Sequence, residues 1–273
     1  MATIYGHQCD LGLFRRTYRA ILEELTRAKG QKRRDGSAKP WPVAEPFRSC
    51  LAAEFHRQFW KPTKLRVVLL AESHVYTDQV DLACKIMTNA LPPDIQHSPS
   101  QFVRLIYSLG YGENGLVSGT LTQANDGTPQ YWKIFGQCAG TSANSDGSLT
   151  WKISTLRALR ARGIWLADTS IHACMNPRFP VSDPRRHLAG YSRGLYRRVL
   201  NLSWQYVKTT VQGCPEIWTI GDGVRKAIPD PLLSQSKWLY QPNGARTTGQ
   251  RVEYAEQMQR LLAAIRMTCI PDT

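Results

Sequence analysis

The stretch that decides the fold is Leu65-Arg-Val-Val-Leu-Leu-Ala71, followed directly by Glu72-Ser-His-Val-Tyr76. The first seven residues form a short, β-branched apolar run, which is typical of a strand buried within a parallel sheet. Polar side chains replace this apolar character at Glu72. In open parallel sheets, ligands bind outside the carboxyl ends of the strands. This stretch therefore predicts a central strand and one corner of a binding site.

Three further runs predict strands of the same kind: 164–168, 216–220 and 237–240. Each strand ends in a polar or glycine-rich segment, namely Asp168-Thr-Ser-Ile-His172, Gly221-Asp-Gly223 and Gln241-Pro-Asn-Gly-Ala-Arg246. Apolar residues at helical spacing predict helices over 11–28, 50–60, 99–109, 149–162 and 251–267, with another long helix through Leu195 and Val199. Strands that alternate with helices predict an α/β fold, a three-layer α/β/α arrangement with a central, mostly parallel four-stranded sheet.

The segment from Gly110 to Ser148 is rich in Gly, Asn, Ser and Thr, and we expect long loops there. The 273 residues, 42% of them hydrophobic, suffice for one sizeable core. Because no linker-like stretch divides the chain, we expect a single domain over 1–273, with residues 1–60 as a helical extension packed on it. The apolar runs are too short to span a membrane, and the chain starts with no apolar signal core. We expect a cytoplasmic monomer, associated with the nucleoid if the source is bacterial.

Charge is the strongest feature of the composition. Thirty-five Lys and Arg residues against 21 Asp and Glu residues give a formal net charge of +14 and a pI near 9.7. Such an excess favours a polyanionic partner, although a basic protein without such a partner has the same composition. One basic cluster runs from Lys29 to Arg34. A second contains Arg185, Arg186, Arg193 and Arg197, interleaved with aromatic residues, which favours nucleic acid over a membrane.

The sequence predicts neither a metal nor a cofactor. The seven cysteines are scattered and form no C-x-x-C pair, so buried free thiols are expected rather than a zinc site or a disulfide framework. An iron–sulfur cluster built from distant cysteines stays open, without any spacing to support it. No Walker-type or dinucleotide-binding glycine motif occurs.

The polar segments at the strand ends, in their order along residues 64–265, resemble those of the uracil-DNA glycosylase superfamily. Leu70-Ala-Glu-Ser-His-Val75 is similar to the motif that holds the catalytic water, with Glu72 where some families carry an acidic residue. Arg162-Gly-Ile-Trp-Leu-Ala-Asp-Thr169 resembles the strand that reads the base, with Asp168 in place of Asn. Residues 215–227 are similar to the strand–glycine–helix element, and 240–246 stand where the superfamily has His-Pro-Ser and a loop that penetrates the duplex.

Besides Asp168 in place of Asn, the chain departs from the superfamily pattern at three further positions. The usual water-holding Asp or Asn falls on Ser73, Gln241 replaces the His that steadies the departing base, and Asn243 replaces the Ser. Two hypotheses therefore stay open. The chain has a rearranged catalytic site, or it binds abasic DNA more than it cuts.

The resemblance implies a role for each candidate, beside which a structural role stays open. Glu72 would orient the attacking water or stabilise the cationic sugar, or else pair with an arginine. Ser73 would hold the water. His74 or His172 would replace the missing His as donor to the base, or serve only as a structural hydrogen-bonder.

The same resemblance assigns base and DNA contacts. Asp168 would accept the N3–H of uracil, unless it only caps a loop. Tyr76 would stack on the extruded base or pack as an ordinary ring. Gln241 and Asn243 would donate to the base or to phosphate, or shape the turn. Arg246 would act as a wedge or phosphate contact. The candidates for backbone contacts are Arg185, Arg186, Arg193 and Arg197.

These assignments predict a DNA glycosylase, free of metal, that hydrolyses the N-glycosidic bond of uracil or a related deaminated base flipped out of DNA. The alternative from another class is a protein that binds uracil-containing or abasic DNA with little or no turnover. A third, weaker hypothesis is an unrelated α/β hydrolase whose basic surface serves RNA.

Overall fold

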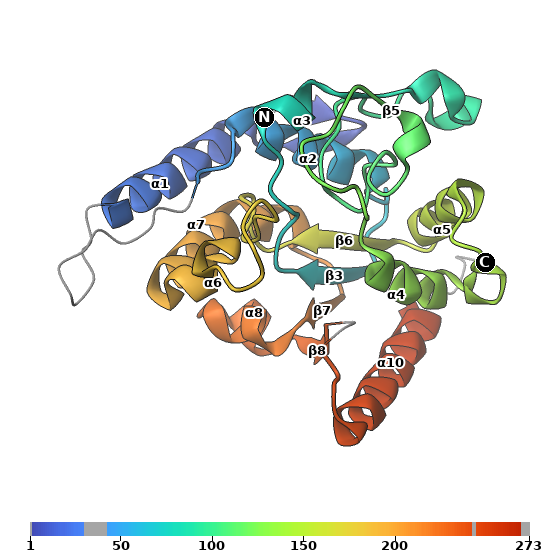
Figure 1. The fold of residues 1–273 in the computed structure, drawn as a ribbon. Coiled ribbons are helices and arrows are strands. Elements are labelled where there is room, and N and C mark those ends of the chain that lie inside the picture. Colours follow the sequence, from blue (N-terminus) through green and yellow to red (C-terminus); the bar gives the residue numbers. More distant parts are fainter. Residues whose placement is uncertain (1, 30–42, 242–243, 269–273) are drawn as a thin grey trace.

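The computed structural model describes residues 2–29, 43–241 and 244–268 (Figure 1). Its centre is a sheet of four parallel strands in the order β6-β3-β7-β8, and helices flank it on both faces. Figure 1 shows the arrowheads of β6 and β3 pointing to the same end of the molecule. The predicted three-layer α/β/α fold is confirmed.

Strand β3 (Val67–Ala71) occupies the middle of this sheet, and all five of its residues are buried. It pairs with β6 (Ile164–Asp168) on one side and with β7 (Glu216–Ile220) on the other. Strand β8 (Lys237–Leu239) pairs with β7 and forms the edge. Because helices cover both faces of β3, its sequence is continuously apolar rather than alternating.

One helical layer contains α4 (Pro129–Ala139), α5 (Leu149–Ala161) and α10 (Thr248–Thr268), since α10 contacts both α4 and β8. The other contains α2 (Phe47–Trp60), α7 (Arg193–Val211) and α8 (Asp222–Ala227), with α1 (Leu11–Lys29) packed against α7. The shorter elements are α3 (Gln79–Ala83), α6 (Leu188–Tyr191), α9 (Pro231–Ser234), the pair β1 (Ala2–Ile4) and β2 (His7–Cys9), the pair β4 (Lys85–Ile86) and β5 (Val117–Ser118), and five single turns of 3-10 helix.

The strand order places the binding end of the sheet. The chain passes from β3 to β6 on one side and then crosses back to β7 on the other. The connections thus leave β3 in opposite directions, which creates a switch point beside its carboxyl end. Ligands of open α/β sheets bind in the crevice at such a point, so the segments that follow β3, β6 and β7 are the first place to look for a site.

Two expectations about the middle of the chain are wrong. The segment 99–109 is irregular, because its residues from Phe102 to Leu109 are all buried and leave no exposed helix face. Its backbone instead bonds to neighbouring loops, through Val75 N to Arg104 O and Arg104 N to the Thr77 hydroxyl. The expected long loops over 110–148 contain helix α4, which begins at Pro129 and ends at Gly140 in the left-handed conformation (φ 73°). Proline at a helix start and glycine at its end are the signals that mark it.

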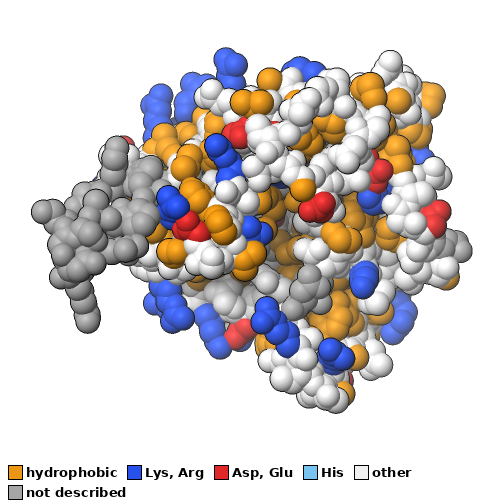
Figure 2. Space-filling model, viewed as in Figure 1, with side chains coloured by type: hydrophobic (Ala, Val, Ile, Leu, Met, Phe, Trp, Pro, Cys, Tyr) orange, Lys and Arg blue, Asp and Glu red, His pale blue; other side chains and the backbone are white. Residues whose placement is uncertain are grey.

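The surface carries its positive charge in many places. Lys and Arg side chains lie around the whole face shown in Figure 2, and Asp and Glu are fewer there. Within the described ranges, no helix is both long and apolar enough to cross a membrane.

Candidate functional site

The carboxyl ends of β3 and β6 bring the two principal candidate segments together. Ala71 is the register partner of Asp168. The backbone then continues the pairing, because Thr169 N donates to Ala71 O at 2.8 Å and Ser170 N donates to Glu72 O at 3.0 Å. Glu72, Ser73 and Asp168 therefore lie on adjacent segments at one end of the sheet, as the sequence predicts.

A side chain of helix α2 holds Asp168 in place. Its Oδ2 accepts a hydrogen bond from Arg57 Nη1 at 2.6 Å, and the Asp168 residue is only 4% exposed. Arg57 Nε also donates to Glu54, which accepts a further bond from the hydroxyl of Tyr206. The other oxygen of Asp168, Oδ1, accepts no hydrogen bond from the described residues. This atom retains some contact with solvent. The carboxylate is thus fixed in orientation with one acceptor left over.

His74 lies between two carboxylates. Its Nε2 donates to Glu45 Oε2 at 2.9 Å, and its Nδ1 lies 3.6 Å from Asp168 Oδ2. Burial lowers the pKa of His74, but the carboxylates of Glu45 and Asp168 outweigh this effect and raise the pKa to about 9. At neutral pH the imidazole is therefore a cation beside Asp168.

Glu45 anchors the loops around this histidine. Its carboxylate accepts from the backbone N–H groups of Thr77 and Ala173, as well as from His74 and the Cys50 thiol. Its own N–H donates to His172 Nε2 at 2.9 Å. Burial, countered by the Glu45 charge, lowers the pKa of His172, so that this ring is a neutral structural acceptor.

Glu45, Cys50 and His74 lie close enough together to raise the question of a metal site. Metal binding requires the thiolate form of cysteine. Burial and the neighbouring Glu45 carboxylate raise the pKa of Cys50 well above its usual value, so the thiol keeps its proton. The Glu45 oxygens are already occupied by N–H donors. Glu45, Cys50 and His74 form a buried hydrogen-bonded cluster in this structure.

Both oxygens of Glu72 are also held. Oε2 accepts from His187 Nε2 at 2.8 Å, and Oε1 accepts from the hydroxyl of Tyr196 at 2.6 Å. The hydrogen bond to Glu72 raises the pKa of His187. Ser73 accepts from Cys174 N at 2.9 Å and donates to the carbonyl of His74. The segment after β3 is therefore tied to the segment after β6 through side chains as well as backbone.

A small cavity of about 30 Å³ opens beside Asp168. Ser73, His74, Thr128 and Tyr131 line it, together with residues of the 104–106 segment. This is about the volume of one water molecule in the liquid. Burial raises the pKa of the Tyr131 hydroxyl, and the nearby carboxylates of Asp168 and Glu72 raise it further. The aromatic ring next to Asp168 is thus Tyr131, from the first turn of α4.

Other candidates lie away from this cavity. Tyr76 and His172 line a separate small cavity with Cys174 and Arg185, and burial raises the pKa of Tyr76 to about 12. Gln241 is exposed after β8, beside Gly221. Since β8 is three strand positions from β6, the spacing of strands puts Gln241 roughly 14 Å from Asp168. Arg246 is exposed, and Asn243 lies outside the described residues.

The arginine candidates divide into two kinds. Arg185 pairs with Asp183 and lies over the Phe179 ring, and Arg186 donates to the Phe179 carbonyl. Arg193 and Arg197 are exposed and form no ion pair with any described residue. Most of the first basic cluster, residues 30–34, lies outside the described residues.

Sequence reasoning missed four residues of this site: Glu45, Arg57, Tyr131 and His187. Arg57 and Glu54 lie three residues apart on a helix whose interior-facing side carries charge, which is a detectable signal of a buried ion pair. His187 was visible only as part of a basic cluster. Glu45 has one partner near in sequence, Cys50, but His74 lies 29 residues away, and the carboxylates near Tyr131 belong to other segments, so no local pattern identifies these contacts.

Comparisons of the chain with protein-family models and with curated proteins, and of the fold with solved structures, gave no match.

Proposed function

We propose that this chain binds DNA at the carboxyl ends of β3 and β6 and hydrolyses the N-glycosidic bond of uracil or a related deaminated base, as a divergent uracil-DNA glycosylase. The observation that carries the proposal is Asp168, a buried carboxylate fixed by Arg57 and His74 at a switch point of the sheet, with Oδ1 unengaged. A carboxylate accepts hydrogen bonds only, so it would select a base with an N–H on its pairing edge.

The neighbouring groups suit the remaining needs of the reaction. Breaking the bond to the base leaves cationic character on the sugar, which a nearby carboxylate stabilises. Glu72 supplies this charge from the adjacent segment, and His187 and Tyr196 hold it in one position. Ser73 lines the cavity and would hold a water for attack, with Glu72 to orient it.

A nucleobase needs more room than the cavity of about 30 Å³ beside Asp168 offers. Tyr131 and Thr128 belong to the first turn of α4 and its N-terminal boundary, so a shift of this one segment would open the cavity. In an enzyme that assembles its pocket around an extruded base, the free energy of binding the flanking strand offsets the cost of opening the pocket.

A second candidate function is binding of uracil-containing or abasic DNA without turnover. Two observations favour it: the cavity is closed to a base, and both oxygens of Glu72 already accept hydrogen bonds. Either function uses the same residues for recognition.

The test is to incubate the protein with a labelled oligonucleotide that contains one uracil and then to treat the product with alkali, which cleaves the strand at abasic sites. The glycosylase predicts strand scission at the uracil, reduced at least about 100-fold in Asp168→Ala. The matched control is Asp94→Ala, which removes an exposed carboxylate paired with Arg157, and it should keep full activity. A mobility shift without scission supports the binder. If neither single-stranded nor duplex DNA shifts at low salt, both functions are refuted.

A further inference from the structure

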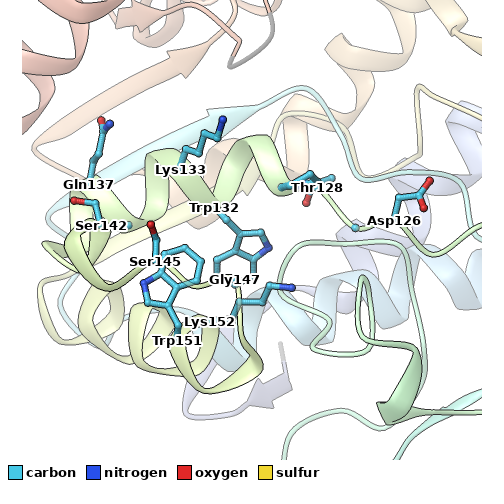
Figure 3. Close-up of a pocket in the computed structure, with 13 residues that line it drawn as sticks. Asp126, Thr128, Trp132, Lys133, Gln137, Ser142, Ser145, Gly147, Trp151 and Lys152 are labelled. Carbon is cyan, nitrogen blue, oxygen red and sulfur yellow. The ribbon is translucent and has the colours of Figure 1, made fainter.

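A cavity that the proposed function does not use lies between helices α4 and α5. Its volume is about 490 Å³. Figure 3 shows the side chains that line it, which come from α4, from the start of α5, from the segment that joins them and from the residues before α4, with the ends of Lys133 and Gln137 directed away from the two tryptophan rings. A cavity of this size accommodates a small planar ligand.

Two tryptophans form the apolar wall of this cavity, which we call the tryptophan cavity. The rings of Trp132 and Trp151 lie 5.9 Å apart between centroids with their planes tilted by 57°, so they form a wedge. Trp151 Nε1 donates to Thr141 O at 2.9 Å, which fixes the indole. Gly136 lets α4 approach this ring closely, because a Cβ there would lie 3.0 Å from the Trp151 ring, a tight contact. Both tryptophans are buried, 6% and 7% exposed, so only part of each ring faces the cavity.

The rim of the tryptophan cavity carries polar groups with free capacity. Lys133 is exposed and forms no ion pair with a described residue, whereas Lys152 pairs with Glu113 and lies over the Trp132 ring. Gln137 and Ser145 are exposed there as well and make no side-chain hydrogen bond within the described ranges. An aromatic wedge with a cation at its rim fits a planar base linked to a phosphate.

The position of Thr128 connects this cavity with the candidate site. Thr128 lines both the tryptophan cavity and the small cavity beside Asp168. Its hydroxyl oxygen is buried and has no hydrogen-bond partner. The two cavities therefore adjoin at this one side chain.

We propose that the tryptophan cavity holds a second nucleobase of the same DNA strand, stacked against Trp132 and Trp151, with its phosphate on Lys133. This inference rests on the proposed function for the identity of the strand. It makes the chain a reader of splayed single strands, since a base within a duplex cannot reach a tryptophan wedge.

The test uses a single-stranded oligonucleotide without uracil, so it does not depend on base excision. Ser145→Trp fills the cavity from its exposed rim, and Lys133→Glu reverses the rim charge. Loss of one stacked base lowers affinity by at least about tenfold, which we expect for Ser145→Trp. The control Arg16→Glu makes the same charge change on exposed α1, which Figure 1 shows on the opposite side from α4. It should weaken binding less than Lys133→Glu.

Photocrosslinking locates the base directly. A uracil-free oligonucleotide that carries 5-iodocytosine should crosslink to the peptides of Trp132 or Trp151, and Ser145→Trp should abolish this crosslink. Crosslinks only elsewhere, or equal losses in Lys133→Glu and Arg16→Glu, would overturn the inference. Binding of free deoxycytidine monophosphate as tightly as the oligonucleotide would also overturn it, because the cavity would then serve a free nucleotide. Loss of uracil excision alone would refute only the proposed function.

Discussion

Arg57 and Asp168 join helix α2 to the carboxyl end of strand β6 through a contact of 2.6 Å between Nη1 and Oδ2. Their side chains are 4% and 3% exposed, so the pair is shielded from solvent. Burial lowers the pKa of Arg57, but Asp168 and Glu54 outweigh it and raise the pKa above its usual value. The candidate base-reading carboxylate is therefore part of the core and not a mobile surface group.

Removing the arginine tests this relationship. Arg57→Met should lower the free energy of unfolding by about 3–5 kcal/mol, because it leaves Asp168 and Glu54 buried without their cation. Urea unfolding measures the change. The control Arg225→Met breaks a partly exposed pair with Asp222 and should cost no more than about 1 kcal/mol. Similar small losses in both variants would show that the buried pair does not organise the site.

The charge of His74 makes stability depend on pH. Its pKa rises from 6.5 in the unfolded chain to about 9 in the fold. Its contribution is complete below the unfolded pKa and disappears as the pH rises through the folded pKa. Between about pH 6 and about pH 8, this group alone should lower the free energy of unfolding by about 2 kcal/mol.

The variant Glu45→Gln isolates this effect, since it removes the carboxylate that raises the histidine pKa. Urea unfolding of both proteins at the two pH values gives the comparison. The pH-dependent loss should be smaller in the variant by most of that amount. An identical pH dependence in the two proteins would mean that Glu45 does not hold His74 in its charged form.

Tyr131 takes the place in the site that the sequence assigned to Tyr76, because it lies against the cavity beside Asp168. Tyr131→Ala should weaken binding of uracil-containing strands by about tenfold, through the loss of one stacked ring. Tyr131→Phe keeps the ring and should bind within about threefold of the parent chain. Tyr76→Phe serves as the control. If Tyr131→Ala binds uracil-containing strands as tightly as the parent chain does, the Tyr131 ring does not stack on the base.

Exposed arginines should set the salt dependence. Changing both Arg193 and Arg197 to Gln should reduce the slope of log affinity against log salt by up to about 2, if each contacts one phosphate. Arg185→Gln should leave the slope unchanged, because that guanidinium is already paired with Asp183. The slopes for the parent chain and for both variants are measured from the affinity, determined by fluorescence anisotropy over a salt series. An unchanged slope in the double variant would place the DNA path elsewhere.

The sequence predicted the sheet well because its signals are local. Strand β6 is an apolar run that ends at Asp168, and β7 is a mostly apolar run that Gly221 ends; both strands have the predicted bounds. Helix α5 follows Ser148, whose side chain caps Trp151 N, so its start was also visible. Helix α4 was missed because its apolar residues lie in a chain segment dominated by Gly, Asn and Ser.

The arrangement of the candidate site was less predictable. The rule that ligands bind at the carboxyl ends of parallel strands placed Glu72 and Asp168 together. It needs only the positions where the strands end. The rule could not reveal that Asp168 pairs with Arg57, because 111 residues separate the two positions. The partners of Glu72, His187 and Tyr196, are likewise more than a hundred residues away. Long-range pairing of charges depends on helix packing, which no local pattern encodes.

The central claim is that the cavity beside Asp168 recognises uracil. The most direct measurement is the affinity for a single-stranded oligonucleotide with one uracil, compared with the same strand carrying cytosine there, for the parent chain and for Asp168→Asn, which keeps the side-chain shape. We expect the parent chain to prefer uracil by at least about tenfold, because the Asp168 carboxylate accepts the N3–H of uracil but meets an unprotonated N3 in cytosine. Asp168→Asn can donate an N–H to that N3, so we expect the variant to lose the preference. Equal affinity of the parent chain for the two strands would contradict the account.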